Sequence, residues 1–322
     1  MSRERSATIA TAGPLGTGDD RLVRAGICAL RVGVALMWIQ NVAWKVPPDF
    51  GERENTGLYL FTRWAVDFPV FPPFAWFVEN VVLAAFPLFG WMTLLMEAGL
   101  GAFLLIGLAT RFWAVVGIVQ SLAITLSVLN APNEWHWAYY LMILAHTAIF
   151  ATAAGRAYGV DGVLRPPLAG IGQGIRKDPR EAVMTRTRFD LPVLTLGGAA
   201  LLSSVFTFSS GGPAPVEFIH IRGAGLALLL IFGAAAVAAG ITRLRLLAII
   251  AGAGLVLAAV LQLVQADQNV NWLSGDASTV ALMGGLGIGL LAVTLTRRHS
   301  ISAHPVSTTQ DRTPDDESDR SA

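Results

Sequence analysis

Long apolar runs separated by short polar segments dominate the chain. Runs long enough to cross a hydrocarbon core, which takes about 17–25 residues, lie at 23–45, 90–109, 112–130, 135–155, 191–209, 223–240, 243–265 and 278–296. We expect a helix over each run, because in lipid a lone segment satisfies its backbone hydrogen bonds only as a helix. The pattern predicts an all-α membrane protein with about eight transmembrane helices.

A shorter apolar segment, from Phe74 to Leu88, precedes the second run. It contains Glu79 and Asn80 and has Pro87 near its end. We interpret it as an interfacial helix that leads into the second span. A ninth span is the alternative, and it would break the alternation of loop charges described next.

Basic residues predict the orientation, since cytoplasmic loops are enriched in Lys and Arg. They gather at 3–24, 111, 156–188, 243–245 and 297–298, on one side of an eight-span path. The segment 49–67 on the other side is acidic. We therefore expect both termini in the cytoplasm, and we interpret the first run as a retained span and not a cleaved signal peptide.

The basic link after the fourth span divides the chain into two modules. The predicted order is a cytoplasmic tail over 1–20, a four-helix membrane module over 21–165, a basic cytoplasmic linker over 166–190, a second four-helix membrane module over 191–299 and a disordered cytoplasmic tail over 300–322. Segments 107–118 and 240–251 are weakly similar, which suggests an internal repeat.

Composition excludes some classes of function. The chain is 54% hydrophobic and 14% charged with a net charge of +1, and nucleic acid is not expected as a ligand. Cys28 is the single cysteine, so intramolecular disulfide exchange is excluded. We predict neither haem nor metal, because His136 and His146 share one helix and no histidine pair from facing helices is evident.

Polar residues interrupt the apolar spans of the first half. A carboxylate inside a span, such as Glu97, costs roughly 2.5–3.5 kcal/mol on insertion scales, so we expect a partner for it. Arg31, Trp38 and Lys45 recur every seven residues and share one helix face, with Asn41 beside them.

A second polar stripe lies on the fourth span. His136, Tyr139, Tyr140 and His146 fall within an arc of about 120° of a helix, and Glu134 precedes them. Under the predicted topology both stripes can face the interior of the first bundle.

These stripes predict a pocket for a small polar or quinone-like ligand. The candidate catalytic residues are Glu97, as a proton acceptor, with His136 and His146 as hydrogen-bond partners of a ring oxygen. The candidate ligand-binding residues are Arg31, Asn41, Lys45, Glu134, Tyr139 and Tyr140.

Structural roles are the alternatives for the same residues. Glu97 and Arg31 can form a buried ion pair that fixes helix register. His146 can be a packing residue, Tyr139 and Tyr140 can belong to an interfacial aromatic belt, and Lys45 can extend to the membrane surface.

Three motifs in the first half resemble a known family. They are ALRVGVALMWIQNVAWK in the first span, the pattern E-x-G-x-G-x5-G-x2-TR from Glu97 to Arg111, and GRAYGVDGVL with Asp161. Together they resemble the DoxX family over about residues 20–165. The loop before Glu97 and the stretch NEWHWAYYLMILA are closer to its DoxD branch, the membrane subunit of thiosulfate:quinone oxidoreductase.

The resemblance implies a four-helix membrane module and, in some relatives, electron transfer from a sulfur compound to quinone with a soluble redox partner subunit. In certain actinobacterial relatives it implies a membrane partner of thiol and superoxide defence proteins. This chain departs from the pattern by its second four-span half, and we see no soluble sulfur-handling domain in it.

We therefore predict a multi-pass protein of a bacterial plasma membrane that serves as a redox-linked subunit, associated with quinone or with sulfur and thiol compounds. Its ligand, quinone or a small reductant, is expected in the outer half of the first bundle. Whether it is catalytic alone, and whether it forms a homo-oligomer, are left open. One alternative is a non-enzymatic scaffold whose basic linker recruits cytoplasmic proteins. Another is a small-molecule transporter, which a midplane cavity between the two halves would favour.

Overall fold

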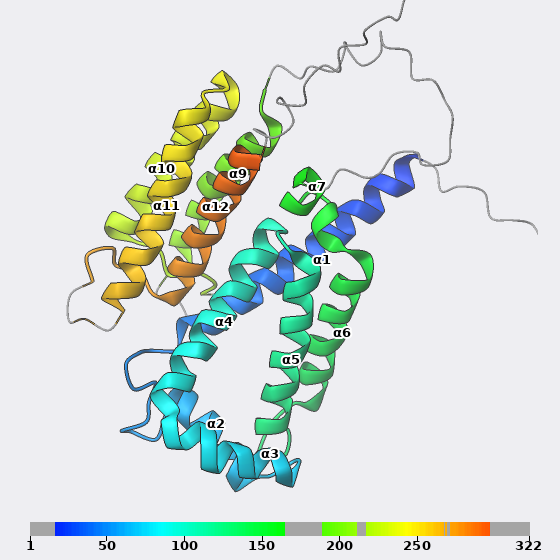
Figure 1. Cartoon of the computed structure of the whole chain (residues 1–322), viewed down its shortest axis with the longest axis vertical. Coiled ribbons are helices and arrows are strands. Elements are labelled where there is room, and N and C mark those ends of the chain that lie inside the picture. Colours follow the sequence, from blue (N-terminus) through cyan, green and yellow to red (C-terminus); the bar gives the residue numbers. More distant parts are fainter. Residues whose placement is uncertain (1–16, 165–188, 211–216, 267, 269–270, 297–322) are drawn as a thin grey trace, which may run out of the picture.

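The computed structural model describes residues 17–164, 189–210, 217–266, 268 and 271–296. Every regular element within these ranges is helical, as the sequence predicts (Figure 1). The predicted cytoplasmic tails and most of the basic linker lie outside the described residues. The scaffold hypothesis that rests on the linker therefore stays a prediction.

Four long helices form the first half of the protein. They are α1 (Thr17–Ala43), α4 (Phe86–Ile106), α5 (Thr110–Val128) and α6 (His136–Thr152). They correspond to the first four predicted spans, and α1 packs closely against α4 while α5 packs against α6.

The second half contains the other four predicted spans. They are α9 (Leu191–Leu202), which continues as the 3-10 helix η4 (Ser203–Phe208), followed by α10 (Gly223–Thr242), α11 (Arg245–Gln265) and α12 (Ala277–Thr296). Of the described helices, seven are long and apolar enough to cross a membrane. The remaining predicted span is α6, whose 17 residues are near the lower limit of about 17 for crossing a bilayer.

Helix α12 joins the two halves. It packs against α11 within its own half and against α4 of the other half. At the crossing with α4, a Cβ on Gly285 would lie 2.9 Å from the carbonyl oxygen of Ala102. Only glycine allows so close an approach of the two backbones.

The glycine pattern of α4 serves helix packing. A Cβ on Gly101 would lie 2.6 Å from the Ile39 side chain of α1, and one on Gly99 would lie 2.5 Å from the Trp113 ring of α5. These glycines let α4 contact its two neighbours closely. The motif that carries the family resemblance is therefore mostly a set of helix interfaces.

Short helical elements precede α4 and lie across one end of the first half (Figure 1). They are α2 (Gly57–Asp67), α3 (Pro72–Phe77), the π-helix η1 (Val78–Val82) and the 3-10 helix η2 (Leu83–Ala85). Helix α2 was not predicted. From Pro72 to Ile106 the chain is helical, with a bend at Ala85, whose φ and ψ are −131° and 40°. The interfacial position of segment 74–88 stays a prediction.

Asp161 orders the opposite end of the first half. Its Oδ1 accepts a hydrogen bond from Ala109 N at 2.8 Å and its Oδ2 accepts one from Thr110 N at 2.9 Å. The Asp161 N–H donates to Gly107 O at 2.8 Å. The carboxylate thus caps the start of α5, where unpaired backbone N–H groups favour negative charge. Thr110 and Arg111, which lie between the predicted spans 90–109 and 112–130, are the first two residues of this helix.

Arg31 is buried at the same end. Its Nη1 donates hydrogen bonds to Leu104 O at 2.9 Å and Leu105 O at 3.1 Å, and its Nη2 donates to Tyr158 O at 3.4 Å. A cation at the carboxyl end of α4 complements the helix dipole. Arg31 therefore holds α1, α4 and the Tyr158 loop together.

Candidate functional site

A cavity of about 1530 Å³ lies mainly within the first half. Its walls come from α1, α2, α4, α5, α6 and the segment 74–82, and most of its lining residues are apolar. Three residues of the second half, described below, also reach it. Because most of the lining belongs to one half, the condition that would favour a transporter between the two halves is not met.

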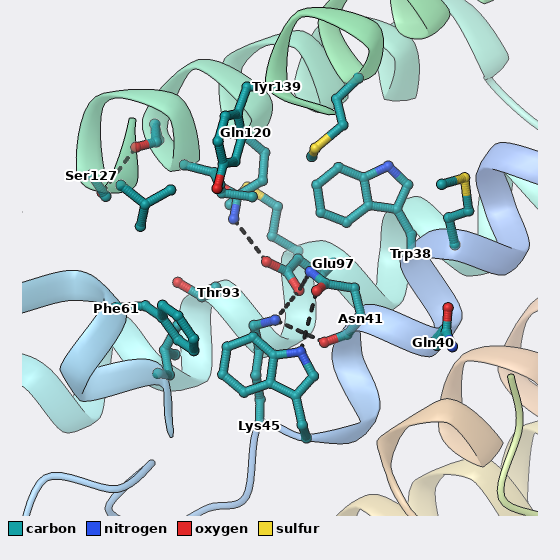
Figure 2. Close-up of a pocket in the computed structure, with 18 of the residues that line it drawn as sticks. Trp38, Gln40, Asn41, Lys45, Phe61, Thr93, Glu97, Gln120, Ser127 and Tyr139 are labelled. Carbon is teal, nitrogen blue, oxygen red and sulfur yellow. Dashed lines mark hydrogen bonds and ion pairs between the residues drawn. The ribbon is translucent and has the colours of Figure 1, made fainter. Parts of the chain in front are cut away.

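Lys45 and Glu97 form a buried ion pair on the wall of this cavity (Figure 2). Lys45 Nζ lies 2.6 Å from Glu97 Oε2, and each side chain is 1% exposed. Asn41 Nδ2 donates to the same oxygen at 3.1 Å, and Gln120 Nε2 donates to Glu97 Oε1 at 3.0 Å. Three donors thus bind the two Glu97 oxygens in an apolar region, one from α1, one from the segment just after α1 and one from α5.

Lys45 is oriented by the end of α1. The helix stops at Ala43, and Lys45 Nζ turns back to donate a hydrogen bond to Asn41 O at 2.9 Å. The ammonium also lies 3.9 Å from the centroid of the Trp44 ring. Trp44 Nε1 in turn donates to Asn41 Oδ1 at 3.2 Å. The charge is thus held by a carboxylate, a carbonyl and an aromatic face.

The ion pair between Arg31 and Glu97, one of the structural alternatives from the sequence, does not form. Arg31 binds carbonyls near the end of α4, at Leu104 and Leu105, whereas Glu97 lies about two helical turns earlier. Lys45, at the other end of α1, is the cation within reach of Glu97. The alternative in which Glu97 and Arg31 form an ion pair is therefore wrong, and Arg31 does not line the described cavity.

His146 has both ring nitrogens engaged. Trp38 Nε1 lies 2.9 Å from His146 Nε2, and His146 Nδ1 lies 2.7 Å from Met142 O. The indole N–H can only donate and the carbonyl can only accept, so the imidazole is neutral with its proton on Nδ1. A Cβ on Gly117 would lie 2.0 Å from the ring. His146 thus links α1, α5 and α6 at the cavity wall.

The remaining candidates on and before α6 divide into two groups. Tyr139 and Glu134 line the cavity, and the Tyr139 hydroxyl donates a hydrogen bond to Glu134 Oε2. His136 and Tyr140 are exposed and do not line the cavity. An arc of about 120° is wide enough to extend from the side of a helix that faces the cavity to a side that is exposed, so periodicity alone did not separate them.

Sequence reasoning did not identify Gln120 as a site residue. An amide inside the apolar run 112–130 was the available signal, because polar side chains in a span usually face a partner or a cavity.

Glu217, His220 and Asp276 of the second half also line the cavity and were not predicted. His220 Nδ1 lies 2.6 Å from Glu217 Oε1. Asp276 precedes α12 and accepts a hydrogen bond from Ser278 N at 2.8 Å, and burial raises the pKa of its carboxyl. In the described part of the chain no three His, Cys, Asp or Glu side chains are arranged to hold a metal ion.

Comparison with known proteins gives one match. Residues 27–173 match the family model described as TQO small subunit DoxD, where TQO is thiosulfate:quinone oxidoreductase. The match confirms the resemblance seen in the sequence and covers most of α1 and all of α2, α4, α5 and α6, the helices that line the cavity. No curated protein and no solved structure matches the chain.

Proposed function

Since residues 27–173 belong to the DoxD family of multi-pass membrane proteins, we propose that this protein is the membrane subunit of a quinone-linked oxidoreductase. The cavity binds the quinone ring beside Lys45 and Glu97. The observation that carries the proposal is a buried ion pair on the wall of a large, mostly apolar cavity inside a membrane bundle. Such intramembrane charges usually mark a functional site.

The cavity suits a quinone as substrate. A quinone has a flat apolar ring with two carbonyl oxygens, which accept hydrogen bonds and carry no charge. The cavity volume of about 1530 Å³ exceeds the roughly 300–1,000 Å³ of common small-molecule sites. Apolar walls accommodate the ring, and Lys45 offers a charged donor for one carbonyl oxygen by exchanging its hydrogen bond to Asn41 O for one to the quinone.

The chemistry requires two electrons and two protons for each quinone reduced to a quinol. The electrons come from a sulfur compound oxidised on a partner subunit, which the family description of a small subunit supports. As negative charge develops on one carbonyl oxygen, Lys45 stabilises it and transfers a proton to it. Glu97, an anion in the resting pair, then accepts a proton from solvent and passes it to Lys45, and the second carbonyl oxygen takes its proton from solvent.

The membrane in question is a bacterial plasma membrane, with the end that carries α2 and α3 facing outward. The predicted excess of basic residues at the Arg111 end supports this orientation. The ion pair then lies on the outer side of the bundle.

The test is quinone binding by the purified protein in mild detergent, measured by quenching of tryptophan fluorescence. Trp38 and Trp44 line the cavity and serve as reporters. Replacing Lys45 and Glu97 together by Met removes both charges and leaves neither unpaired. We expect binding to weaken by at least about tenfold, since charge-assisted hydrogen bonds contribute roughly 1.5–3 kcal/mol each.

The matched control is the exposed ion pair of α2. Arg63 Nε lies 3.4 Å from Asp67 Oδ2, and both side chains are at least 41% exposed. Replacing these two residues by Gln and Asn should leave binding unchanged. Equal quinone affinity of the wild type and the Lys45 and Glu97 double variant would overturn the proposed site.

A further inference from the structure

The cavity reaches the lipid-facing surface of the bundle. Leu30, Gly33 and Met37 follow one another at spacings of three and four on α1, and all three are exposed and line the cavity. Leu141 on α6 has the same two properties, with 51% of its surface exposed. These residues lie within two long apolar helices, where an exposed side chain faces hydrocarbon and not water.

We infer that the cavity opens sideways into the bilayer between α1 and α6, and that this opening holds the apolar chain of a lipid-soluble quinone. The inference rests on the proposed function and adds to it where the opening lies and which residues line it. The substrate enters from the membrane and not from the aqueous phase.

Charge distribution along the cavity supports this occupant. At one end Lys45, Asn41 and Glu97 provide hydrogen bonds and charge for a polar head group. At the opening between α1 and α6 the residues are aliphatic or lack a side chain, so they can contact only an apolar group. A molecule with one polar end and one hydrocarbon chain matches both ends of the cavity.

Gly33 determines how wide the opening is. A Cβ at Gly33 would meet no atom within 4 Å, so a larger side chain there would project into the opening without straining the fold. Gly26 lies seven residues earlier on the same face of α1, is also exposed and also has nothing within 4 Å. It does not line the cavity, so it provides a matched control.

The experiment measures the affinity of two quinones with the same ring, one without a chain and one with a decyl chain. The proteins are the wild type, Gly33→Phe and Gly26→Phe, each purified in mild detergent, with tryptophan quenching as the readout. We expect Gly33→Phe to weaken binding of decylquinone by about tenfold, the effect of excluding about two methylenes. Binding of the ring alone should stay within about twofold, and Gly26→Phe should change neither.

A second pair of variants tests the other edge of the opening. Leu141 and Leu144 of α6 are 51% and 62% exposed, and only Leu141 lines the cavity. Leu141→Phe should selectively weaken decylquinone binding, and Leu144→Phe should not. The two pairs are independent, so misfolding of one variant does not remove the test.

Three results would overturn the inference. The first is equal weakening of both quinones by Gly33→Phe, which would place the ring itself at the opening. The second is unchanged decylquinone affinity in both Gly33→Phe and Leu141→Phe. The third is wild-type protein that does not prefer the decyl chain, which would leave a membrane phospholipid as the occupant of the opening. If the wild type binds neither quinone, the proposed function fails as well, so the two failures are distinguishable.

Discussion

Lys45 Nζ and Glu97 Oε2 lie 2.6 Å apart, with 1% of each side chain exposed. The pair connects the segment just after α1 to the middle of α4, and almost none of either side chain is exposed. Burying two charges has a desolvation cost that their attraction offsets only in part, and losing one partner is worse than losing both. This asymmetry gives a test of whether both groups are ionised.

We expect Glu97→Gln to destabilise the protein by roughly 3–5 kcal/mol, because it leaves the Lys45 ammonium buried without a counter-charge. Adding Lys45→Met to this variant should recover most of the loss. Thermal unfolding in mild detergent measures both effects. If the double variant is as unstable as Glu97→Gln, the two charges do not compensate each other and the ion pair is not the stabilising feature.

Because His146 is neutral and hydrogen-bonded on both ring nitrogens, we expect its replacement to lower the stability of the protein. His146→Leu removes the acceptor of the Trp38 Nε1 hydrogen bond and leaves a buried N–H unsatisfied, which costs about 1–3 kcal/mol. We expect a lower melting temperature with quinone affinity retained within about threefold. His146→Gln keeps an acceptor and should be less destabilised. Loss of quinone reduction at unchanged stability would restore the catalytic role predicted from the sequence.

The helices were predictable because the bilayer restricts what a long apolar run can be. The predicted run 223–240 became Gly223–Thr242, and the run 278–296 became Ala277–Thr296. Helix α2 was missed because Gly57–Asp67 is short and mixes apolar with charged residues, so its length did not indicate a span.

The site was only partly predictable. A spacing of seven placed Arg31 and Lys45 on the same face of the predicted first span, but it did not say which of them reaches Glu97. In the structure α1 ends at Ala43, so Lys45 lies just beyond the helix. That choice depends on where α4 crosses α1, which is set by contacts such as Gly101 against Ile39. Gln120 was missed for the same reason. Which side chains of α5 face the cavity depends on how that helix is rotated about its axis in the folded protein.

Asp161 predicts a capping effect at the other end of the bundle. Asp161→Ala removes the acceptors of the Ala109 and Thr110 N–H groups and should destabilise the protein by about 0.5–2 kcal/mol. Asp161→Asn keeps one side-chain oxygen, so its stability should lie between those of Asp161→Ala and the wild type. The control is Glu79→Ala, which removes an exposed carboxylate and should change the melting temperature little. Equal melting temperatures for Asp161→Ala and wild type would contradict the capping role.

Asp276 predicts a dependence of stability on pH. Burial is the main cause that raises the pKa of its carboxyl above the ordinary value of 3.8, while hydrogen bonds from Ser278 and Thr279 and the nearby His220 oppose the shift. The folded state therefore binds this proton more tightly than the unfolded state. This contribution to stability is complete below 3.8 and is lost as the pH rises through the pKa of the folded protein.

Asp276→Asn removes this titration and leaves a neutral group of similar shape. We expect the variant to gain stability relative to the wild type on going from about pH 4 to about pH 7, since only the wild type must bury a charge at the higher pH. Thermal unfolding in detergent at the two pH values measures the difference. Asp49→Asn changes a more exposed carboxylate of the first half, whose side chain is 32% exposed, and serves as the control. If the difference in stability between Asp276→Asn and wild type is the same at both pH values, the hydrogen bonds from Ser278 and Thr279 fully offset the effect of burial on the pKa of Asp276.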